Sequence, residues 1–325
     1  FNIQECQVQK SFQLMISSLV VTGLLSSCTA MTQKSAEKQA PSSAEQEYTQ
    51  IIAFGDSYSD DGASYEITNR MVDQGVKDSM IFPGDLYWQN RWTNGPTAVE
   101  VMADELDIPL IDYAVGGAKS GEDNYYHWMN PYEKTGVIGQ VESFSTTLNG
   151  QPADADALYF IFISANDFFE HTDYALEGTV TALADSAVAN IDKAVAQLST
   201  LGAKHFMIVN SSDLEILPAV TAAGQTELAS EFQTRFNTRL QSLTETLVNN
   251  THVDITLFDH IAASNMIMKN PEDYGFTNLT DACQPVYPEV KPVCGSPDEY
   301  YFWDEWHPTR HVHAIMGEKM AEAAL

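Results

Sequence analysis

The sequence predicts an α/β fold in which a mostly parallel sheet of about five strands lies between two layers of helices. Two observations support this class. From Gln50 onward, short apolar runs alternate with longer segments of helical periodicity, and no internal repeat or second domain boundary interrupts them. We therefore expect a single folded domain over residues 48–325.

The expected strands are short runs rich in Ile, Leu, Val and Phe, a composition that suits strands buried on both faces of a parallel sheet. The expected helices place apolar residues three and four positions apart. The strands cover residues 51–54, 108–113, 158–163, 206–209 and 255–258, and the helices cover 97–105, 180–201, 225–249 and 314–324.

Residues 58–95 and 119–145 are rich in Tyr, Trp, Asn, Gly and Pro, and we expect long loops there. Long loops in compact domains often cover binding sites. Their aromatic side chains either line an apolar channel for an acyl chain or pin the loops to the body of the domain. The residues concerned are Trp88, Trp92, Tyr125, Tyr126 and Trp128.

Residues 1–28 have the layout of a secretory signal. Lys10 precedes an apolar run over residues 12–25, which is short for a membrane span, and small residues follow. The segment Leu-Ser-Ser-Cys28 resembles a bacterial lipobox, in which a lipidated Cys28 would tether the protein to a membrane. Residues 29–47 would form a flexible tether. We expect export from a bacterial cell, either as a lipoprotein of the outer membrane or as a secreted protein.

The remaining cysteines fit an exported protein. Cys283 and Cys294 lie close together in a loop that contains Pro and Gly, with no further Cys or paired His at metal-ligand spacing. In an oxidising compartment this arrangement indicates a local disulfide. Cys6 would be removed with the signal.

The net charge of −29 is spread along the chain. Such a surface argues against nucleic acid as a partner and fits a neutral or zwitterionic substrate. The sequence has no P-loop, no GxGxxG and no metal-binding cluster, so we expect no cofactor and no metal. It does not indicate an oligomeric state.

The first expected strand ends in Gly-Asp-Ser57. Ser57 would lie at the carboxyl end of a strand, where open α/β sheets bind their ligands and where helix amides stabilise developing negative charge. It is therefore a candidate nucleophile. The alternative is that Ser57 is the N-cap of the helix that follows.

Asp304 and His307 stand three residues apart, shortly before the last expected helix. This spacing allows the carboxylate to meet imidazole Nδ1 while Nε2 faces a serine, as in a Ser-His-Asp triad. The carboxylate would orient the ring, and the histidine would carry the proton. The alternative is a surface pair.

Gly117 follows the second expected strand and Asn166 follows the third. A glycine allows its backbone N–H to approach a substrate oxygen, and an asparagine amide supplies another donor. With the N–H of Ser57 they would form an oxyanion hole of three donors. The alternatives are a tight turn at Gly117 and a helix cap at Asn166.

These blocks, in this order, resemble the SGNH or GDSL-type lipases and esterases over residues 48–325. The loop at residues 91–96, Arg-Trp-Thr-Asn-Gly-Pro, is similar to the branch that contains the Vibrio thermolabile hemolysins (lecithinases) and the glycerophospholipid–cholesterol acyltransferases. Lys119 departs from the family pattern, which leaves the acyl-chain pocket and the choice of substrate open.

The resemblance implies a three-layer, flavodoxin-like SGNH-hydrolase domain and a serine ester hydrolase. Ser57, His307 and Asp304 would form its triad, and fatty-acyl esters of lipids would be cleaved through an acyl-serine. Acyl transfer to an alcohol or short-chain carboxylesterase activity are the alternatives, and carbohydrate deacetylation is a weaker one. Outside enzymes, the chain would be a surface lipoprotein that binds lipid or a partner.

Overall fold

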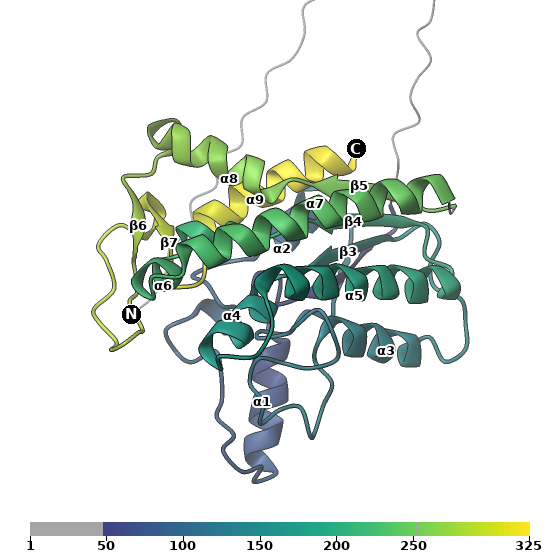
Figure 1. Ribbon diagram of the computed structural model, residues 1–325, viewed down its shortest axis with the longest axis horizontal. Coiled ribbons are helices and arrows are strands. Elements are labelled where there is room, and N and C mark those ends of the chain that lie inside the picture. Colours follow the sequence, from purple (N-terminus) through teal and green to yellow (C-terminus); the bar gives the residue numbers. More distant parts are fainter. Residues whose placement is uncertain (1–47, 251) are drawn as a thin grey trace, which may run out of the picture. The chain divides into compact units, whose positions relative to one another are not determined.

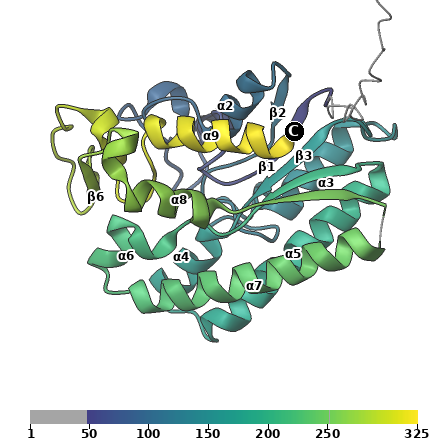
Figure 2. The same cartoon turned by 90° about the horizontal axis from the view of Figure 1, so that it is seen from above.

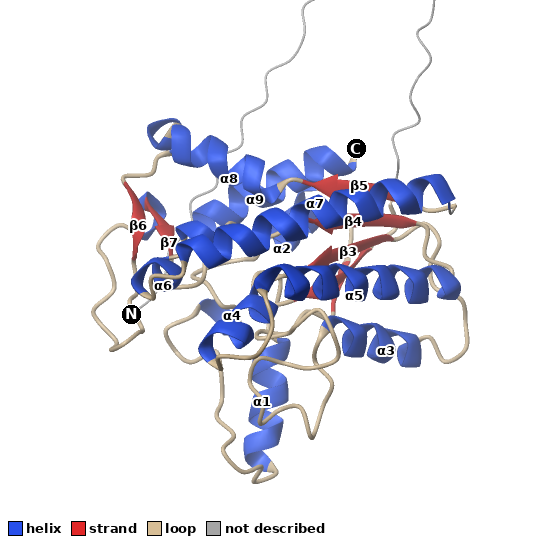
Figure 3. Cartoon of the chain, viewed as in Figure 1, coloured by secondary structure: helices blue, strands red, loops and turns tan. Residues whose placement is uncertain are grey.

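The computed structural model describes residues 48–250 and 252–325, and a parallel sheet of five strands forms its centre (Figure 3). The strands are β1 (Ile51–Gly55), β2 (Leu110–Asp112), β3 (Leu158–Phe162), β4 (His205–Val209) and β5 (Asp254–Phe258). Their order across the sheet is β2-β1-β3-β4-β5. The predicted α/β class is confirmed, and all five expected strands are present.

The helices lie on both faces of this sheet (Figure 2). They are α1 (Ala63–Asp73), α2 (Ala98–Glu105), α3 (Val137–Thr147), α4 (Ala165–Asp173), α5 (Val180–Leu201), α6 (Pro218–Ala222), α7 (Thr226–Asn250), α8 (His260–Lys269) and α9 (Arg310–Ala324). Helices α2 and α9 pack together on one face, and α3, α5 and α7 cover the other. The sheet is therefore the middle layer of three.

The order of the strands reverses between β1 and β3, because the chain moves from β1 to one edge and from β3 to the other. Both strands are buried along their whole length. In open α/β sheets, such a reversal opens a crevice outside the carboxyl ends of the strands. Ser57 follows β1 and Asn166 follows β3, so the topology brings both residues to this crevice.

Helix α9 packs closely on α2 at Gly317. A Cβ at this position would lie 2.6 Å from Ala98 O and 2.6 Å from Val101 Cβ, so only glycine allows the two helices to approach this far. Helix α9 begins at Arg310, four residues before the predicted start. Helix α9, the last helix, is thus held against α2, which directly follows the long region at residues 58–95.

The two regions expected to be long loops contain helices, and here the prediction is wrong in part. Helix α1 lies within residues 58–95, and α3 begins within residues 119–145. Helix α1 buries Ser64, Ile67, Thr68 and Met71, which have helical spacing, but two of the four are polar. The apolar periodicity that predicts a helix is therefore weak in this segment, although its buried residues have helical spacing. Helices α4, α6 and α8 were also not predicted.

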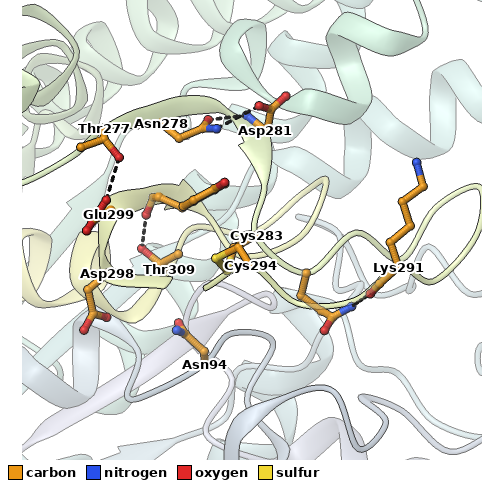
Figure 4. Close-up of a disulfide and its surroundings, with 12 residues drawn as sticks. Asn94, Thr277, Asn278, Asp281, Cys283, Lys291, Cys294, Asp298, Glu299 and Thr309 are labelled. Atoms are coloured by element: carbon orange, nitrogen blue, oxygen red, sulfur yellow. Dashed lines mark hydrogen bonds between the residues drawn. A yellow bond between two sulfur atoms is a disulfide. The ribbon is translucent and has the colours of Figure 1, made fainter. Parts of the chain in front are cut away.

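A small second sheet follows α8 at one end of the domain (Figure 1). It pairs β6 (Asn278–Ala282) with β7 (Tyr300–Phe302) in parallel. Between these strands, Cys283 and Cys294 are joined by a disulfide with an S–S distance of 2.09 Å (Figure 4). We call residues 283–294 the disulfide loop.

No helix among residues 48–250 and 252–325 is long and apolar enough to cross a membrane. Over the same residues, no group of three His, Cys, Asp or Glu side chains is arranged to hold a metal ion. The predicted signal, Cys28 and tether lie in residues 1–47, outside the described part of the chain.

Candidate active site

Ser57 lies in a tight turn directly after β1. The N–H groups of Ser59 and Asp60 both donate to Asp56 O at 3.0 Å, which closes the turn. The next helix, α1, begins only at Ala63 and has Gly62 at its N-cap position. Ser57 is therefore not the N-cap of the helix that follows, and this alternative interpretation is wrong.

The end of β1 is fixed by Gln140 of α3. Its side chain accepts a hydrogen bond from Gly55 N at 2.9 Å and donates one to Gly55 O at 2.8 Å. A Cβ at Gly55 would lie 2.7 Å from Phe162 O on the neighbouring strand, so this position requires glycine. Together these contacts determine where the turn that carries Ser57 leaves the sheet.

The structure brings Ser57, near the start of the domain's sequence, together with Asp304 and His307, near its end. His307 Nε2 lies 2.8 Å from Ser57 Oγ, and His307 Nδ1 lies 2.7 Å from Asp304 Oδ2. With the ring proton on Nδ1, the imidazole donates to Asp304 and accepts from the Ser57 hydroxyl. Both distances are within hydrogen-bond range, so a proton can pass from Ser57 to His307 without movement of the backbone.

Asp304 is completely buried, and hydrogen bonds satisfy both of its carboxylate oxygens. Oδ1 accepts from the backbone N–H groups of Trp306 and His307, each at 2.7 Å. Oδ2 accepts from Tyr87 OH at 2.7 Å in addition to the imidazole. Burial, and next the nearby Asp304 carboxylate, raise the pKa of Tyr87 far above its usual value, so this hydroxyl remains a donor. The role of Tyr87 was not predicted, since it lies in a long loop 217 residues from Asp304.

Gly117 occupies the turn after β2 with a φ of 79°, a left-handed conformation that favours glycine. A Cβ there would lie 2.4 Å from Asn124 Oδ1. Within the described residues, neither the Ser57 N–H nor the Gly117 N–H donates a hydrogen bond, and both residues line the same cavity. These two backbone donors are therefore free to bind an oxygen atom of a ligand.

Asn166 lies in the first turn of α4, but it is not the helix cap, because Ser164 occupies that position. Its side-chain amide donates to Ala118 O at 3.0 Å and lies 3.5 Å from Asp56 Oδ2. Burial raises the pKa of Asp56 to about 7. The hydrogen bonds to Ala118 and, at the longer distance, to Asp56 use both amide hydrogens, so an oxyanion would replace the contact with Asp56. Asn166 lines the cavity that Ser57 and Gly117 also line.

Asp60 supports the glycine turn, and sequence reasoning missed this role. The Asp60 carboxylate is fully buried and accepts from Gly116 N at 2.8 Å, from Trp92 Nε1 at 3.2 Å and from Gly62 N at 2.9 Å. A Cβ at Gly116 would lie 2.2 Å from Trp92 Nε1, so the indole ring packs directly on this turn. Asp60 thus links the turn after β1 to the turn after β2.

A cavity of about 870 Å³ opens above Ser57, a size typical of small-molecule sites. Three of the five aromatic residues that were candidates for an apolar channel line it, namely Trp92, Tyr125 and Tyr126. The other two pack elsewhere: Trp128 contacts Phe82, and Trp88 lies under the Arg91 guanidinium. Trp92, Tyr125 and Tyr126 therefore line the cavity, while Trp88 and Trp128 pack within the loops; a channel for an acyl chain stays a prediction.

Comparisons with known proteins find a family profile, related sequences and solved structures that are similar to this chain. The profile of the GDSL-like Lipase/Acylhydrolase family matches residues 51–320. The thermolabile hemolysin of Vibrio parahaemolyticus is 27% identical over 84% of this chain and 63% of its own length, so the chain spans less than two thirds of that relative. The phosphatidylcholine-sterol acyltransferase of Aeromonas hydrophila is 22% identical over 84% of this chain and 89% of its own. Among solved structures, the aryl esterase of M. smegmatis has a TM-score of 0.43 and 16% identity, over 84% of this chain and 97% of its own.

The fold and the family match define an α/β carboxylic ester hydrolase. The chain belongs to the GDSL-like lipase/acylhydrolase family. The predicted family and class of enzyme are thereby confirmed.

Proposed function

We propose that this protein cleaves fatty-acyl esters of lipids through an acyl-serine intermediate, with Ser57 as the nucleophile. The observation that carries the proposal is the hydrogen-bonded series Ser57–His307–Asp304 at the base of the cavity. His307 is the general base and acid, and Asp304 orients its ring.

In the first step, Ser57 Oγ attacks the ester carbonyl carbon and its proton passes to His307 Nε2. The carbonyl oxygen becomes an oxyanion, which accepts hydrogen bonds from Ser57 N, Gly117 N and Asn166 Nδ2. When the intermediate collapses, the C–O bond to the alcohol breaks and His307 returns the proton to the departing oxygen. Water, deprotonated by His307, then releases the fatty acid and restores Ser57.

The cavity favours a lipid without net negative charge. Its lining contains no Lys or Arg, and it includes the carboxylates of Asp173, Asp304 and Glu305. Lys119 does not line it and is paired with Glu170 at 2.7 Å. Because a carboxylate-lined site in a chain of net charge −29 repels anions, a neutral or zwitterionic ester fits best. The name of the phosphatidylcholine-sterol acyltransferase relative also favours a lipid substrate.

Hydrolysis of p-nitrophenyl esters from acetate to palmitate, measured beside phosphatidylcholine, tests the proposal. Turnover of the long esters or of phosphatidylcholine is expected. Activity confined to acetate and butyrate would instead indicate a short-chain carboxylesterase. Release of less fatty acid than alcohol in the presence of a sterol, with formation of a sterol ester, would indicate acyl transfer.

Replacement of Asn166 by Ala is expected to lower kcat by about two to three orders of magnitude, because one oxyanion donor contributes about 3 kcal/mol in the transition state. Asn190→Ala is the matched control: this partly buried amide also donates a hydrogen bond, to Ser120 Oγ at 3.0 Å, but does not line the cavity. Full activity of Asn166→Ala would contradict a role of this amide in the oxyanion hole. The amide of the wild type would then have only a structural contact, from α4 to Ala118.

Replacement of Tyr87 by Phe is expected to lower kcat about five- to thirtyfold with little change in KM. The variant removes one hydrogen bond to the Asp304 carboxylate, whose net contribution is about 1 to 2 kcal/mol, and keeps the aromatic ring in the cavity. Tyr159→Phe is the control, since the Tyr159 hydroxyl also donates a hydrogen bond, to Asp154 O at 2.8 Å, but Tyr159 does not line the cavity. A rise in KM alone for Tyr87→Phe would show that Tyr87 acts on the substrate and not on Asp304.

A further inference from the structure

Two groups of residues with different chemistry line the cavity. Tyr125 OH donates to Asp173 at 2.9 Å, so this part of the lining presents hydroxyl and carboxylate groups. Ala219, Ala222 and Ala223 lie on and directly after α6, and we call this small-residue, apolar part of the lining the apolar wall. The first part suits a polar alcohol portion of a substrate, and the apolar wall suits a hydrocarbon chain.

The disulfide loop completes the apolar wall. Its residues Val286, Tyr287 and Pro288 line the same cavity as the alanines of α6. Helix α6 and this end of the small sheet lie side by side (Figure 1). Apolar side chains from two separate segments therefore border one continuous space that reaches Ser57.

Glu305, the neighbour of Asp304, connects both segments to the catalytic loop. Its backbone oxygen accepts from Ala219 N at 3.0 Å. Its carboxylate accepts hydrogen bonds from Val286 N at 3.1 Å and from Tyr287 N at 3.3 Å. These two backbone N–H groups stabilise its negative charge. The Cys283–Cys294 bond closes the loop at its base. The wall is thus held at a fixed position relative to His307.

We propose that the acyl chain of the substrate lies between α6 and the disulfide loop, and that Ala222 limits the chain length that the enzyme accepts. This inference rests on the proposed lipid-ester hydrolysis and assigns the binding site for its apolar portion. Burial of methylene groups against this wall contributes binding energy that grows with chain length. A large side chain at Ala222 would occupy the space of several methylene groups.

The test compares Ala222→Trp with Thr221→Trp on p-nitrophenyl esters of two to sixteen carbons. Ala222 is exposed on the cavity wall, whereas Thr221, the preceding residue of the same helix, is exposed but does not line the cavity. We expect Ala222→Trp to lower the ratio of kcat/KM for palmitate to that for acetate by about tenfold or more. Thr221→Trp should leave the ratio and the activity at the wild-type level.

An active Ala222→Trp enzyme with an unchanged ratio would overturn the assignment of the acyl site and leave the proposed hydrolysis intact. A wild-type enzyme that hydrolyses no ester of the series would instead remove the proposed function, and the acyl site with it. Ala223→Leu, a smaller change on the same wall, carries the same expectation if the tryptophan variant does not fold. A variant that lost acetate and palmitate activity equally would also contradict a role in chain length.

Discussion

Replacement of Ser57 by Ala is expected to lower kcat/KM for p-nitrophenyl butyrate by about five orders of magnitude. The variant removes the hydroxyl that is placed to attack the ester carbonyl with His307 as its base, and the remaining rate comes from the oxyanion donors and binding. The side chain is small, and its hydroxyl contacts His307 Nε2 at 2.8 Å. The melting temperature should therefore change little.

Ser59→Ala is the matched control for this loss. Ser59 lies two residues further along the same turn, and its buried hydroxyl has no hydrogen-bond partner among the described residues. Removing that hydroxyl should preserve the activity and the stability. Substantial hydrolysis by Ser57→Ala, together with failure of a fluorophosphonate probe to label the wild type, would rule out the acyl-serine mechanism.

Replacement of Asp304 by Asn is expected to reduce kcat by about three to four orders of magnitude. The carboxylate accepts a hydrogen bond from His307 Nδ1–H, but an asparagine amide can donate an N–H to Nδ1 instead. The ring proton then lies on Nε2, and the imidazole cannot deprotonate Ser57. The size of the side chain is preserved, so the effect should be on kcat more than on KM.

Asp298→Asn serves as the comparison for this variant. Asp298 also lies close to β7 and is paired with Arg310. Its side chain is exposed and forms no hydrogen bond with His307. We expect it to change activity less than twofold, since exposed ion pairs contribute little to stability. Equal losses in both variants would point to damage of this region of the fold and not to the tautomer of His307.

The sheet and the candidate catalytic residues could be predicted because each depends on local sequence. The strands β1 and β3 are continuous apolar runs and the others are mostly apolar, and Asp304 and His307 are only three residues apart. Ser57, Gly117 and Asn166 each follow a strand, and strands of one parallel sheet end at the same edge. Their convergence on one cavity therefore follows from the class of fold.

The supporting residues could not be predicted, since their partners are distant in the sequence. Tyr87 reaches Asp304 across 217 residues, and Gln140 reaches Gly55 across 85. Asp60 is buried through contacts with Gly116 and Trp92, which no local pattern reveals. Helix α1 was missed for a related reason. Half of its buried residues are polar, so the apolar pattern that predicts a helix is weak there.

Ser57 and His307 lie 250 residues apart in the chain, and α9, which follows the histidine, packs on α2 through Gly317. During translation, the nucleophile leaves the ribosome long before its base does. A nascent chain that ends before His307 has no imidazole to serve as the base that the proposed mechanism requires. Under that mechanism, ester hydrolysis begins only after nearly the whole domain has been synthesised and folded.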